Sequence, residues 1–171
     1  MATEIASTVS TRGIYANDTT RGYVSAYDAN FPPWASTAER WWTYFDARAW
    51  LAGGFVWTGF DYRGEPTPYK WPCISSHFGI LDTCGFPKDN FWYYKAVWSS
   101  EPVLHLFPHW NWAGQEGTPI PVMAYTNAEE VELFLNGQSL GRKQKGAELF
   151  EMPVGPKISE DRRFLTKYRL V

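Results

Sequence analysis

The stretch FVWTGFDYRGEPTPYKWP, residues 55–72, begins as an apolar strand and then fills with charges, prolines and aromatic rings. Two glycines at positions 53 and 54 come directly before it. The charged side chains that follow the strand are Asp61, Arg63 and Glu65, and the rings around them are Trp57, Phe60, Tyr62 and Trp71. This pattern has two interpretations. It is either an ordinary strand end followed by a long turn, or the rim of a site that binds a flat, polar ligand.

Composition limits the classes of protein to which the chain can belong. The 171 residues are 44% hydrophobic and 20% charged, which is typical of a globular protein with one sizeable domain or two small ones. The net charge of −2 gives no general case for nucleic-acid binding, and no apolar run approaches the ~20 residues that a membrane span needs. Residues 1–13 show neither the basic nor the apolar region of a signal peptide. Cys73 and Cys84 match no metal-site spacing, so we expect two packed thiols.

Aromatic residues are unusually frequent. They make up 18% of the chain, and all ten Trp fall between Trp34 and Trp112. Such crowding suits sugar recognition, because ring faces cover the C–H face of a pyranose while polar groups hold its hydroxyls. The alternative is that most of these rings belong to the core or pack between helices. Composition alone leaves both interpretations open.

Residues 1–101 carry the signals of two helices, one strand and a long loop. Ser36 and Glu39 form a capping box that predicts a helix N-terminus, and the pair Gly53-Gly54 predicts the end of that helix. Residues 55–60 predict a short strand, and residues 61–87 predict a long loop of the kind that is usually functional. A second amphipathic helix is predicted over residues 87–100.

From residue 102 onward the pattern changes to the alternation of β-strands. Apolar and polar residues alternate over 130–135, and Asn136-Gly137 is a strong hairpin signal. These features predict a small, sandwich-like β module. From Leu140 the chain becomes basic, with eight Lys/Arg against four Asp/Glu in residues 141–171. This composition favours a solvated, loosely ordered tail over a surface for anionic ligands.

The strand inventory of residues 1–101 is too small for a complete domain. One strand flanked by two helices cannot close a sheet or bury both of its faces. We therefore predict that residues 1–101 are the end of something larger, and that a separate β domain begins at residue 102.

Four stretches show what the larger object is: STVSTRG at 7–13, GGFVWTGFDYRGEPTPY at 53–69, SSHFGILDTCGFPKD at 75–89 and PHWNW at 108–112. Together they resemble the β-galactosidases of glycoside hydrolase family 2, in the form common in gut Bacteroidetes. The resemblance implies a C-terminal fragment of α/β plus β class. Residues 1–101 would be the last segment of an incomplete (β/α)8 TIM barrel, from the end of strand seven through strand eight and its helix. Residues 102–171 would be part of an immunoglobulin-like β-sandwich with a diverged basic tail.

The resemblance assigns the catalytic nucleophile to Glu4, within TEIASTVSTRG. Retaining glycosidases use two carboxyl groups about 5–5.5 Å apart, one to attack the anomeric carbon and one to shuttle the proton. In the family the acid/base Glu lies on an earlier strand, and no candidate precedes Glu4. The resemblance thus implies retaining hydrolysis of terminal β-galactosides in carbohydrate catabolism, while the chain alone is expected to be inactive.

The same resemblance places other residues around the sugar. Trp57 matches the Trp that ends barrel strand eight and forms the floor under the non-reducing sugar. Asp61 and Arg63, together with Glu65, either hold sugar hydroxyls or pair with one another. His77 either borders the sugar pocket or is an ordinary hydrogen-bonded loop side chain. No cofactor or metal is expected, because no cluster has metal-ligand spacing and no Gly-rich loop cradles phosphate.

The expected partner is a β-galactoside or a related oligosaccharide, with no nucleic acid and no membrane span. Exposed apolar surface on an incomplete barrel predicts self-association. The resemblance implies a periplasmic or secreted bacterial protein. Two other hypotheses remain, a non-catalytic carbohydrate-binding module and a structural fragment. The sugar also stays open, because the family includes glucuronidases and mannosidases.

Overall fold

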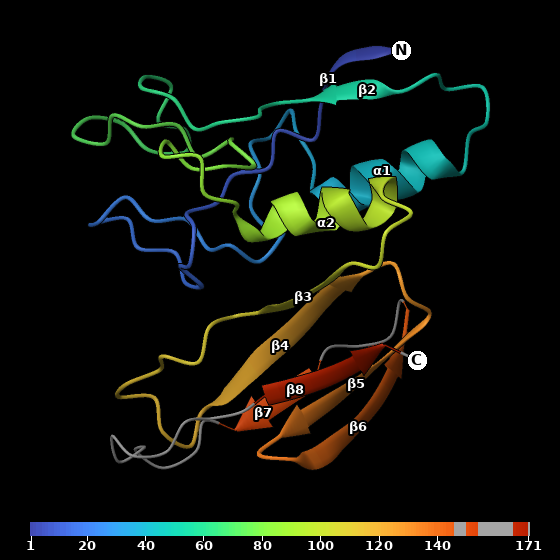
Figure 1. Cartoon of the computed structure of the whole chain (residues 1–171). Coiled ribbons are helices and arrows are strands. Elements are labelled where there is room, and N and C mark those ends of the chain that lie inside the picture. Colours follow the sequence, from blue (N-terminus) through green and yellow to red (C-terminus); the bar gives the residue numbers. More distant parts are fainter. Residues whose placement is uncertain (146–149, 154–165, 171) are drawn as a thin grey trace. The chain divides into compact units, whose positions relative to one another are not determined.

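A computed structural model describes residues 1–145, 150–153 and 166–170 of the chain (Figure 1). The chain divides into two compact units, unit 1 (Met1–Lys95) and unit 2 (Ala96–Val171). The division falls within helix α2 (Asp89–Trp98), a few residues before the change from helical to strand patterns in the sequence.

Unit 1 is built on two parallel strands that lie far apart in sequence. β1 (Ala2–Ile5) pairs with β2 (Gly54–Val56), with Ala2 opposite Gly54 and Ile5 opposite Val56. Helix α1 (Ala38–Asp46) lies on the connection between them. This order with parallel pairing is that of α/β proteins. Within the described residues the sheet of unit 1 has two strands and closes no barrel, so the barrel segment stays a prediction.

Helix α1 packs directly on β2. A Cβ added at Gly54 would lie 2.6 Å from Ile5 Cγ2 and 3.1 Å from the ring of Trp41, which belongs to α1. The absence of a side chain at position 54 therefore lets helix and strand approach each other. The second glycine of the pair therefore has a packing role.

Helix α1 begins one residue later than the capping-box prediction implies. Thr37, not Ser36, is the N-cap, and its side chain accepts a hydrogen bond from the backbone N–H three residues on. The carboxylate of Asp28 accepts from Ala38 N (3.1 Å) and Glu39 N (3.0 Å). Side chains thus satisfy three amides of the first turn. The capping box was wrong because Asp28, which the fold brings from outside the helix, already occupies the amides of that turn.

Helix α1 also ends earlier than predicted, at Asp46 and not at the two glycines. Arg48 Nη1 donates to Tyr44 O (2.7 Å), and the guanidinium carbon lies 3.5 Å from the centre of the Tyr44 ring. This bond occupies a carbonyl of the last turn, so the Arg48 side chain caps the C-terminus of the helix. Residues 47–53 then form turns that lead to β2.

The long loop after β2 is confirmed, and backbone pairing orders it. Thr58 N donates to Phe78 O (3.2 Å), and Leu81 N donates to Gly59 O (3.0 Å). Farther on, Tyr62 O accepts from the backbone of residue 76 (2.8 Å). The loop therefore doubles back on itself without regular strands, through isolated bridges that are parallel near β2 and antiparallel farther on.

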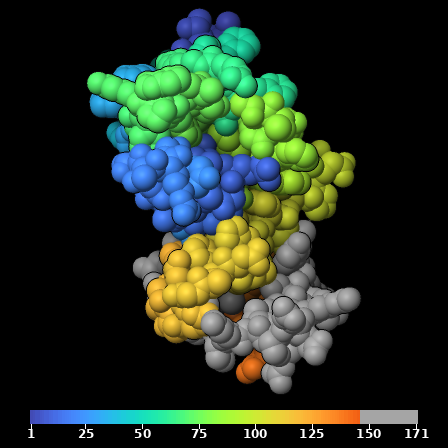
Figure 2. All heavy atoms as spheres, turned by 90° about the vertical axis from the view of Figure 1, so that its left-hand side faces the viewer, coloured from blue at the N-terminus to red at the C-terminus, as the bar shows by residue number. Residues whose placement is uncertain are grey.

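The core of unit 1 lies between this loop and the segment that follows β1. Val9, Val24 and Phe78 form a buried cluster, and Tyr69 packs against it. The Tyr69 hydroxyl also donates to Tyr23 O (2.5 Å). Figure 2 shows the segment after β1 (blue) directly beside the loop after β2 (green).

Among its described residues, unit 2 contains two three-stranded antiparallel sheets. In spatial order, one holds β3 (Leu104–Phe107), β4 (Pro119–Thr126) and β7 (Phe150–Pro153), and the other holds β6 (Gln138–Gln144), β5 (Glu130–Leu135) and β8 (Thr166–Leu170). Val122 of β4 and Leu133 of β5 are both 0% exposed and form one core cluster, so the two sheets share a core. The predicted β module is present, and its immunoglobulin-like identity stays a prediction.

The hairpin predicted at Asn136-Gly137 is confirmed. These residues join β5 to β6 with φ angles of 52° and 82°, as a two-residue hairpin turn requires. The loosely ordered tail was wrong for the residues of β7 and β8, because these strands pair with β4 and β5. Residues 140–144 belong to β6, which pairs with β5, so the prediction was wrong there as well. Residues 146–149, 154–165 and 171 of the basic stretch lie outside the described residues.

Both cysteines are free. Cys73 is partly buried, whereas Cys84 is exposed. Cys84 lies in a tight turn, where its backbone N–H donates a hydrogen bond to Asp82 Oδ1 (2.9 Å). The prediction of a packed thiol was therefore wrong at Cys84.

Candidate active site

The carboxyl ends of β1 and β2 bring together two side chains that the sequence singled out. Glu4 is the second-to-last residue of β1, and Trp57 is the first residue after β2. Trp57 N still donates to Ile5 O (3.2 Å), so the two chains are hydrogen-bonded at this point. Glu4 is exposed and Trp57 is 37% exposed, which leaves both side chains accessible to a ligand. The carboxyl ends of parallel strands are where α/β proteins carry their binding sites.

The backbone directly after Glu4 is held in a rare conformation. Ala6 and Ser7 have φ angles of 61° and 54°, in the left-handed region that side chains disfavour. Both residues are buried, and the Ser7 hydroxyl donates to Glu4 Oε1 (3.1 Å). Such backbone persists only where the surroundings enforce it, and it is frequent at active sites. The turn therefore fixes the place of the Glu4 carboxylate.

Tyr62 connects the two strand ends to the loop. Its ring meets Trp57 edge-on, with centroids 6.1 Å apart and planes at 81°, and its hydroxyl donates to Glu65 Oε2. Burial raises the pKa of Tyr62 to about 12, helped by the hydrogen bond to Glu65 and by the charges of Glu65 and Glu4. The Glu65 carboxylate, the Tyr62 phenol and the Trp57 indole thus meet beside the end of β2.

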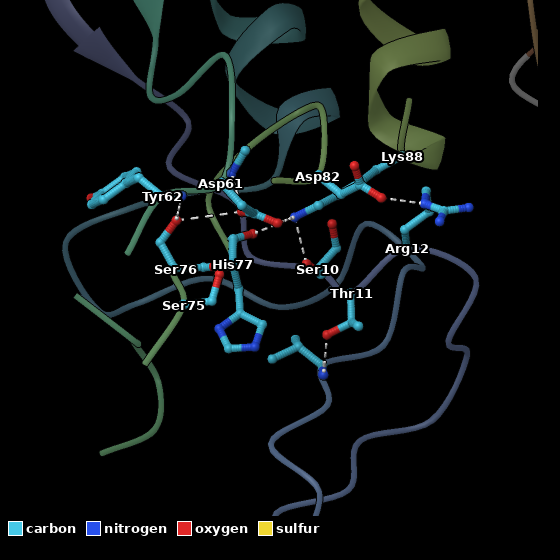
Figure 3. Close-up of polar contacts among 12 residues, drawn as sticks. Ser10, Thr11, Arg12, Asp61, Tyr62, Ser75, Ser76, His77, Asp82 and Lys88 are labelled. Carbon is cyan, nitrogen blue, oxygen red and sulfur yellow. Dashed lines mark hydrogen bonds and ion pairs between the residues drawn. The ribbon is translucent and has the colours of Figure 1, made fainter. Parts of the chain in front are cut away.

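Asp61 does not face this cluster as a free carboxylate, because it forms an ion pair with Lys88 (Figure 3). Lys88 Nζ lies 2.7 Å from Asp61 Oδ2, and the two side chains are 0% and 10% exposed. Burial lowers the pKa of Lys88, and the charge and hydrogen bond of Asp61 act against that shift. Asp61 Oδ1 in addition accepts from Gly79 N (2.8 Å). The interpretation in which Asp61, Arg63 and Glu65 pair with one another is therefore not supported. Asp61 pairs with Lys88, and Glu65 accepts a hydrogen bond from Tyr62.

Arg63 is exposed and makes no ion pair with another of the described residues. It lines an open hollow of about 500 Å³ with five other residues, Asp61, Tyr62, Ile74, Ser75 and Thr83. Tyr62 belongs to both the hollow and the strand-end cluster, so the two adjoin. The arginine and the hydroxyls of the hollow can donate hydrogen bonds to a polyhydroxylated ligand.

His77 lies in neither place. Its ring is buried, with Nε2 2.9 Å from Gly22 O and Nδ1 3.2 Å from Thr67 O. The ring also meets Tyr69 edge-on at 5.6 Å. Both nitrogens therefore lie within hydrogen-bond distance of backbone carbonyls, and the side chain ties the loop to the segment after β1.

Among the described residues, no group of three or more His, Cys, Asp or Glu could hold a metal ion. No helix in that part of the chain is long and apolar enough to cross a membrane.

Comparison with known sequences finds relatives along most of the chain. Residues 117–168 match a family described as "Domain of unknown function (DUF4982)". Over 84% of its length the chain is 44% identical to "Beta-galactosidase BoGH2A" of Bacteroides ovatus, and it covers 19% of that protein. A "Beta-glucuronidase" of Bacteroides fragilis is 31% identical over 116 residues, which are 62% of this chain and 16% of that protein.

Solved structures give the same answer. A beta-glycosidase from Bacteroides vulgatus aligns with a TM-score of 0.78 and 31% identity, over 99% of this chain and 27% of its own. A glycosyl hydrolase family 2 member from Bacteroides cellulosilyticus aligns with a TM-score of 0.60 and 27% identity, over 75% of this chain and 22% of its own. This chain is a relative of the family 2 glycoside hydrolases. The resemblance stated from the four motifs is confirmed.

The family 2 relatives are much longer than the aligned region. The chain spans 19% and 16% of the two curated relatives named above. Their names include both a beta-galactosidase and a beta-glucuronidase. Homology to glycosidases is thus established, and the relatives' names cover two different sugars.

Sequence reasoning missed Lys88 and Ser10 and gave Tyr62 only a place in an aromatic wall. Lys88 is one lysine among sixteen Lys and Arg residues, and nothing in its local pattern distinguishes a buried lysine from an exposed one. The signal that could have found it is the neighbouring motif, since Lys88 belongs to the stretch SSHFGILDTCGFPKD that carries the resemblance.

Proposed function

We propose that this chain supplies part of the active site of a retaining β-galactosidase, with Glu4 as nucleophile and Trp57 as the floor under the sugar. The observation that carries the proposal is the pairing at the strand ends, where Trp57 N donates to Ile5 O next to Glu4. The match to a beta-galactosidase at 44% identity supports the substrate.

In the proposed reaction the Glu4 carboxylate attacks the anomeric carbon, and a sugar ester of Glu4 forms as the leaving group departs. A second carboxyl group about 5–5.5 Å away protonates the leaving oxygen, then takes a proton from the water that hydrolyses the ester. Asp61 is unsuited to that role because both of its carboxylate oxygens already have protein partners, Lys88 Nζ and Gly79 N. We place the acid/base Glu outside residues 1–171, as the resemblance implies.

Sugar contacts divide between the strand ends and the hollow. The exposed part of Trp57 offers a ring face to the C–H face of a pyranose. Arg63 and the hydroxyls of Ser75 and Thr83 can bind sugar or aglycone hydroxyls from the hollow. Asp61 and His77 are expected to act by holding the loop, because their polar atoms already have protein partners.

The test uses the protein expressed from its complete reading frame. We expect Glu4→Gln to lower kcat/KM for nitrophenyl β-galactoside by about a thousandfold or more, because the amide cannot form the glycosyl ester. Glu39→Gln, at an exposed position of α1, is the matched control and should retain activity. A 2-fluoro-galactosyl fluoride should add one fluorinated hexosyl group to the peptide that contains Glu4. Labelling of another residue, or full activity of Glu4→Gln, would refute the assignment.

A second candidate substrate is a β-glucuronide. It is favoured by Arg63, whose charge has no ion-pair partner among the described residues and could bind a uronate carboxylate. The negative charges of Glu4 and Glu65 would repel a uronate carboxylate. For this reason we place the galactoside first. Parallel assays with nitrophenyl β-galactoside and nitrophenyl β-glucuronide decide between the two substrates. If the substrate is a glucuronide, Arg63→Ala should lower kcat/KM for the glucuronide more than kcat/KM for the galactoside.

Residues 1–171 alone are expected to give no turnover, because one carboxylate cannot serve as both nucleophile and proton donor. Hydrolysis by the chain alone that disappears in Glu4→Gln would contradict this. The alternative is a non-catalytic carbohydrate-binding role, and galactose binding by the chain that is lost in Trp57→Ala would favour it. The third possibility, a structural fragment, predicts neither binding nor turnover.

The proposal includes a location outside the bacterial cytoplasm, in the periplasm or the medium. The resemblance supports it, since family 2 enzymes of this form are commonly exported. Fractionation of cells that express the complete reading frame, followed by detection of the protein in each fraction, is the direct test.

A further inference from the structure

Lys88 is a charged side chain in the interior of unit 1. It is 0% exposed, and its ammonium nitrogen lies 2.7 Å from Asp61 Oδ2. The same ammonium donates to Ser10 O (2.7 Å) and His77 O (3.1 Å), as Figure 3 shows. An ammonium has three N–H donors, and here each has an acceptor.

The three acceptors belong to three segments of the chain. Ser10 lies in the segment that follows β1 and Glu4, while Asp61 lies in the loop that follows β2 and Trp57. His77 lies on the returning arm of that loop. One ammonium thus ties together the two segments that carry the proposed nucleophile and the proposed sugar floor.

Burial makes this link intolerant of displacement. A charge removed from water is stabilised only when every donor and acceptor around it is matched. If the segment at Ser10 moved relative to the loop, the buried ammonium would lose an acceptor and the free energy of the native state would rise. Asp61 is held in turn, because its Oδ1 accepts from Gly79 N (2.8 Å) and Ser76 Oγ (3.4 Å).

We propose that Lys88 and Asp61 are positioning residues that fix Glu4 and Trp57 relative to each other at the ends of β1 and β2. Neither acts on the sugar itself, since Lys88 is fully buried and Asp61 is engaged by Lys88 and the loop. The inference rests on the proposed function, which gives Glu4 and Trp57 their roles.

The first test measures the position of Trp57 without any substrate. The 171-residue chain is labelled with 5-fluorotryptophan, and the Trp57 fluorine resonance is assigned from its loss in Trp57→Phe. We expect Lys88→Met to shift or broaden that resonance beyond its linewidth. Lys70→Met, at an exposed lysine of the same loop, should leave it in place. The Trp110 resonance of unit 2 serves as the internal reference and should stay constant.

The double variant Lys88→Met/Asp61→Asn separates positioning from stability. Because it leaves no unpaired buried charge, it should regain most of the melting temperature that Lys88→Met loses. Its Trp57 resonance should stay displaced. In the protein expressed from its complete reading frame, its kcat/KM for nitrophenyl β-galactoside should stay about 10²-fold below wild type. If Lys88→Met fails to fold, the double variant carries both measurements.

Two outcomes would overturn the inference. One is an unchanged Trp57 resonance in the folded variants. The other is recovery of kcat/KM together with the melting temperature in the double variant, which would leave the pair a purely stabilising role. Failure of the proposed function is distinct, because Glu4→Gln would then keep its activity while the Trp57 resonance still responded to Lys88→Met.

Discussion

Gly79 occupies a point in unit 1 where backbone meets backbone. A Cβ at this position would lie 2.1 Å from Asp61 N, 2.3 Å from Leu81 O and 2.4 Å from Phe60 C. Backbone atoms cannot rotate aside, so even one methyl group would force the two arms of the loop apart. We expect Gly79→Ala to lower the free energy of unfolding by roughly 3 kcal/mol, measured by denaturant titration.

Gly59 is the matched control for that substitution. It lies in the same loop, and a Cβ there would meet nothing within 4 Å. Gly59→Ala should therefore change the free energy of unfolding by less than about 1 kcal/mol. A loss of stability in Gly59→Ala as large as that in Gly79→Ala would contradict the steric explanation.

Single residues differ in how far the sequence could predict them. Glu4 and Trp57 were selected through the resemblance, and the structure places them at adjacent strand ends. Lys88 was not selected, because its burial depends on carbonyls from distant segments that only the fold brings together, and only its place in the motif of residues 75–89 pointed to it. His77 was left with two interpretations, and its two carbonyl partners favour the hydrogen-bonded one.

At the scale of elements, the start of helix α1 offers a direct test of capping. Thr37→Ala removes the side chain that accepts from Arg40 N (3.0 Å), so we expect a loss of about 1 kcal/mol in the free energy of unfolding. Ser36→Ala, the position that the sequence favoured, removes only a hydroxyl that donates to Thr37 O and should cost less. Thermal unfolding of both variants decides, and a larger effect at Ser36 would restore the capping-box prediction.

The turn at residues 82–86 of the loop should make stability depend on acid pH through Asp82. Burial acts against its charge, but hydrogen bonds from Phe86 N, Arg12 and Cys84 N, with the Arg12 charge, prevail and lower its pKa. Arg12 Nε lies 2.6 Å from Asp82 Oδ2. A carboxylate whose pKa is lower in the folded state stabilises it fully above the unfolded value, about 3.9. That contribution is lost as the pH falls through the folded-state pKa.

Asp82→Asn should therefore be less stable than wild type near pH 7, and the difference should shrink below about pH 4. Denaturant unfolding of both proteins across this range measures it. Asp46→Asn, at an exposed carboxylate that makes no ion pair with another of the described residues, is the control. A pH-independent difference would mean that Asp82 acts through its shape and not its charge.

Elements were predictable where their signals are local. The Asn136-Gly137 turn and the second helix needed only neighbouring residues, and both are present. The bounds of α1 were missed because Asp28 and Arg48, which set its two ends, lie outside it. Strands β7 and β8 were missed for a related reason, since their partners β4 and β5 come earlier in the chain and their own residues carry a basic composition.

At the scale of the molecule, the strand pair of unit 1 has features of an association surface. Among the described residues β1 and β2 pair only with each other, so each strand has one unpaired edge. Phe55 of β2 is 61% exposed. Unpaired edges with exposed apolar side chains are templates for contact with another chain. We predict that residues 1–171 alone self-associate, with a sedimentation coefficient that rises with concentration.

Phe55→Ser should shift this equilibrium toward the monomer, because it removes apolar area from the strand pair while leaving the backbone intact. Trp34→Ser is the matched control: Trp34 is also exposed, at 66%, but lies outside β1 and β2, so its loss should change association less. Equal effects of the two substitutions on self-association would indicate non-specific hydrophobic association and not a contact at the edge of the strand pair. So small a sheet is expected to need further strands for stability. A wild-type chain that stays monomeric at high concentration and unfolds cooperatively would contradict this prediction. It would mean that the two-stranded sheet is stable without a partner.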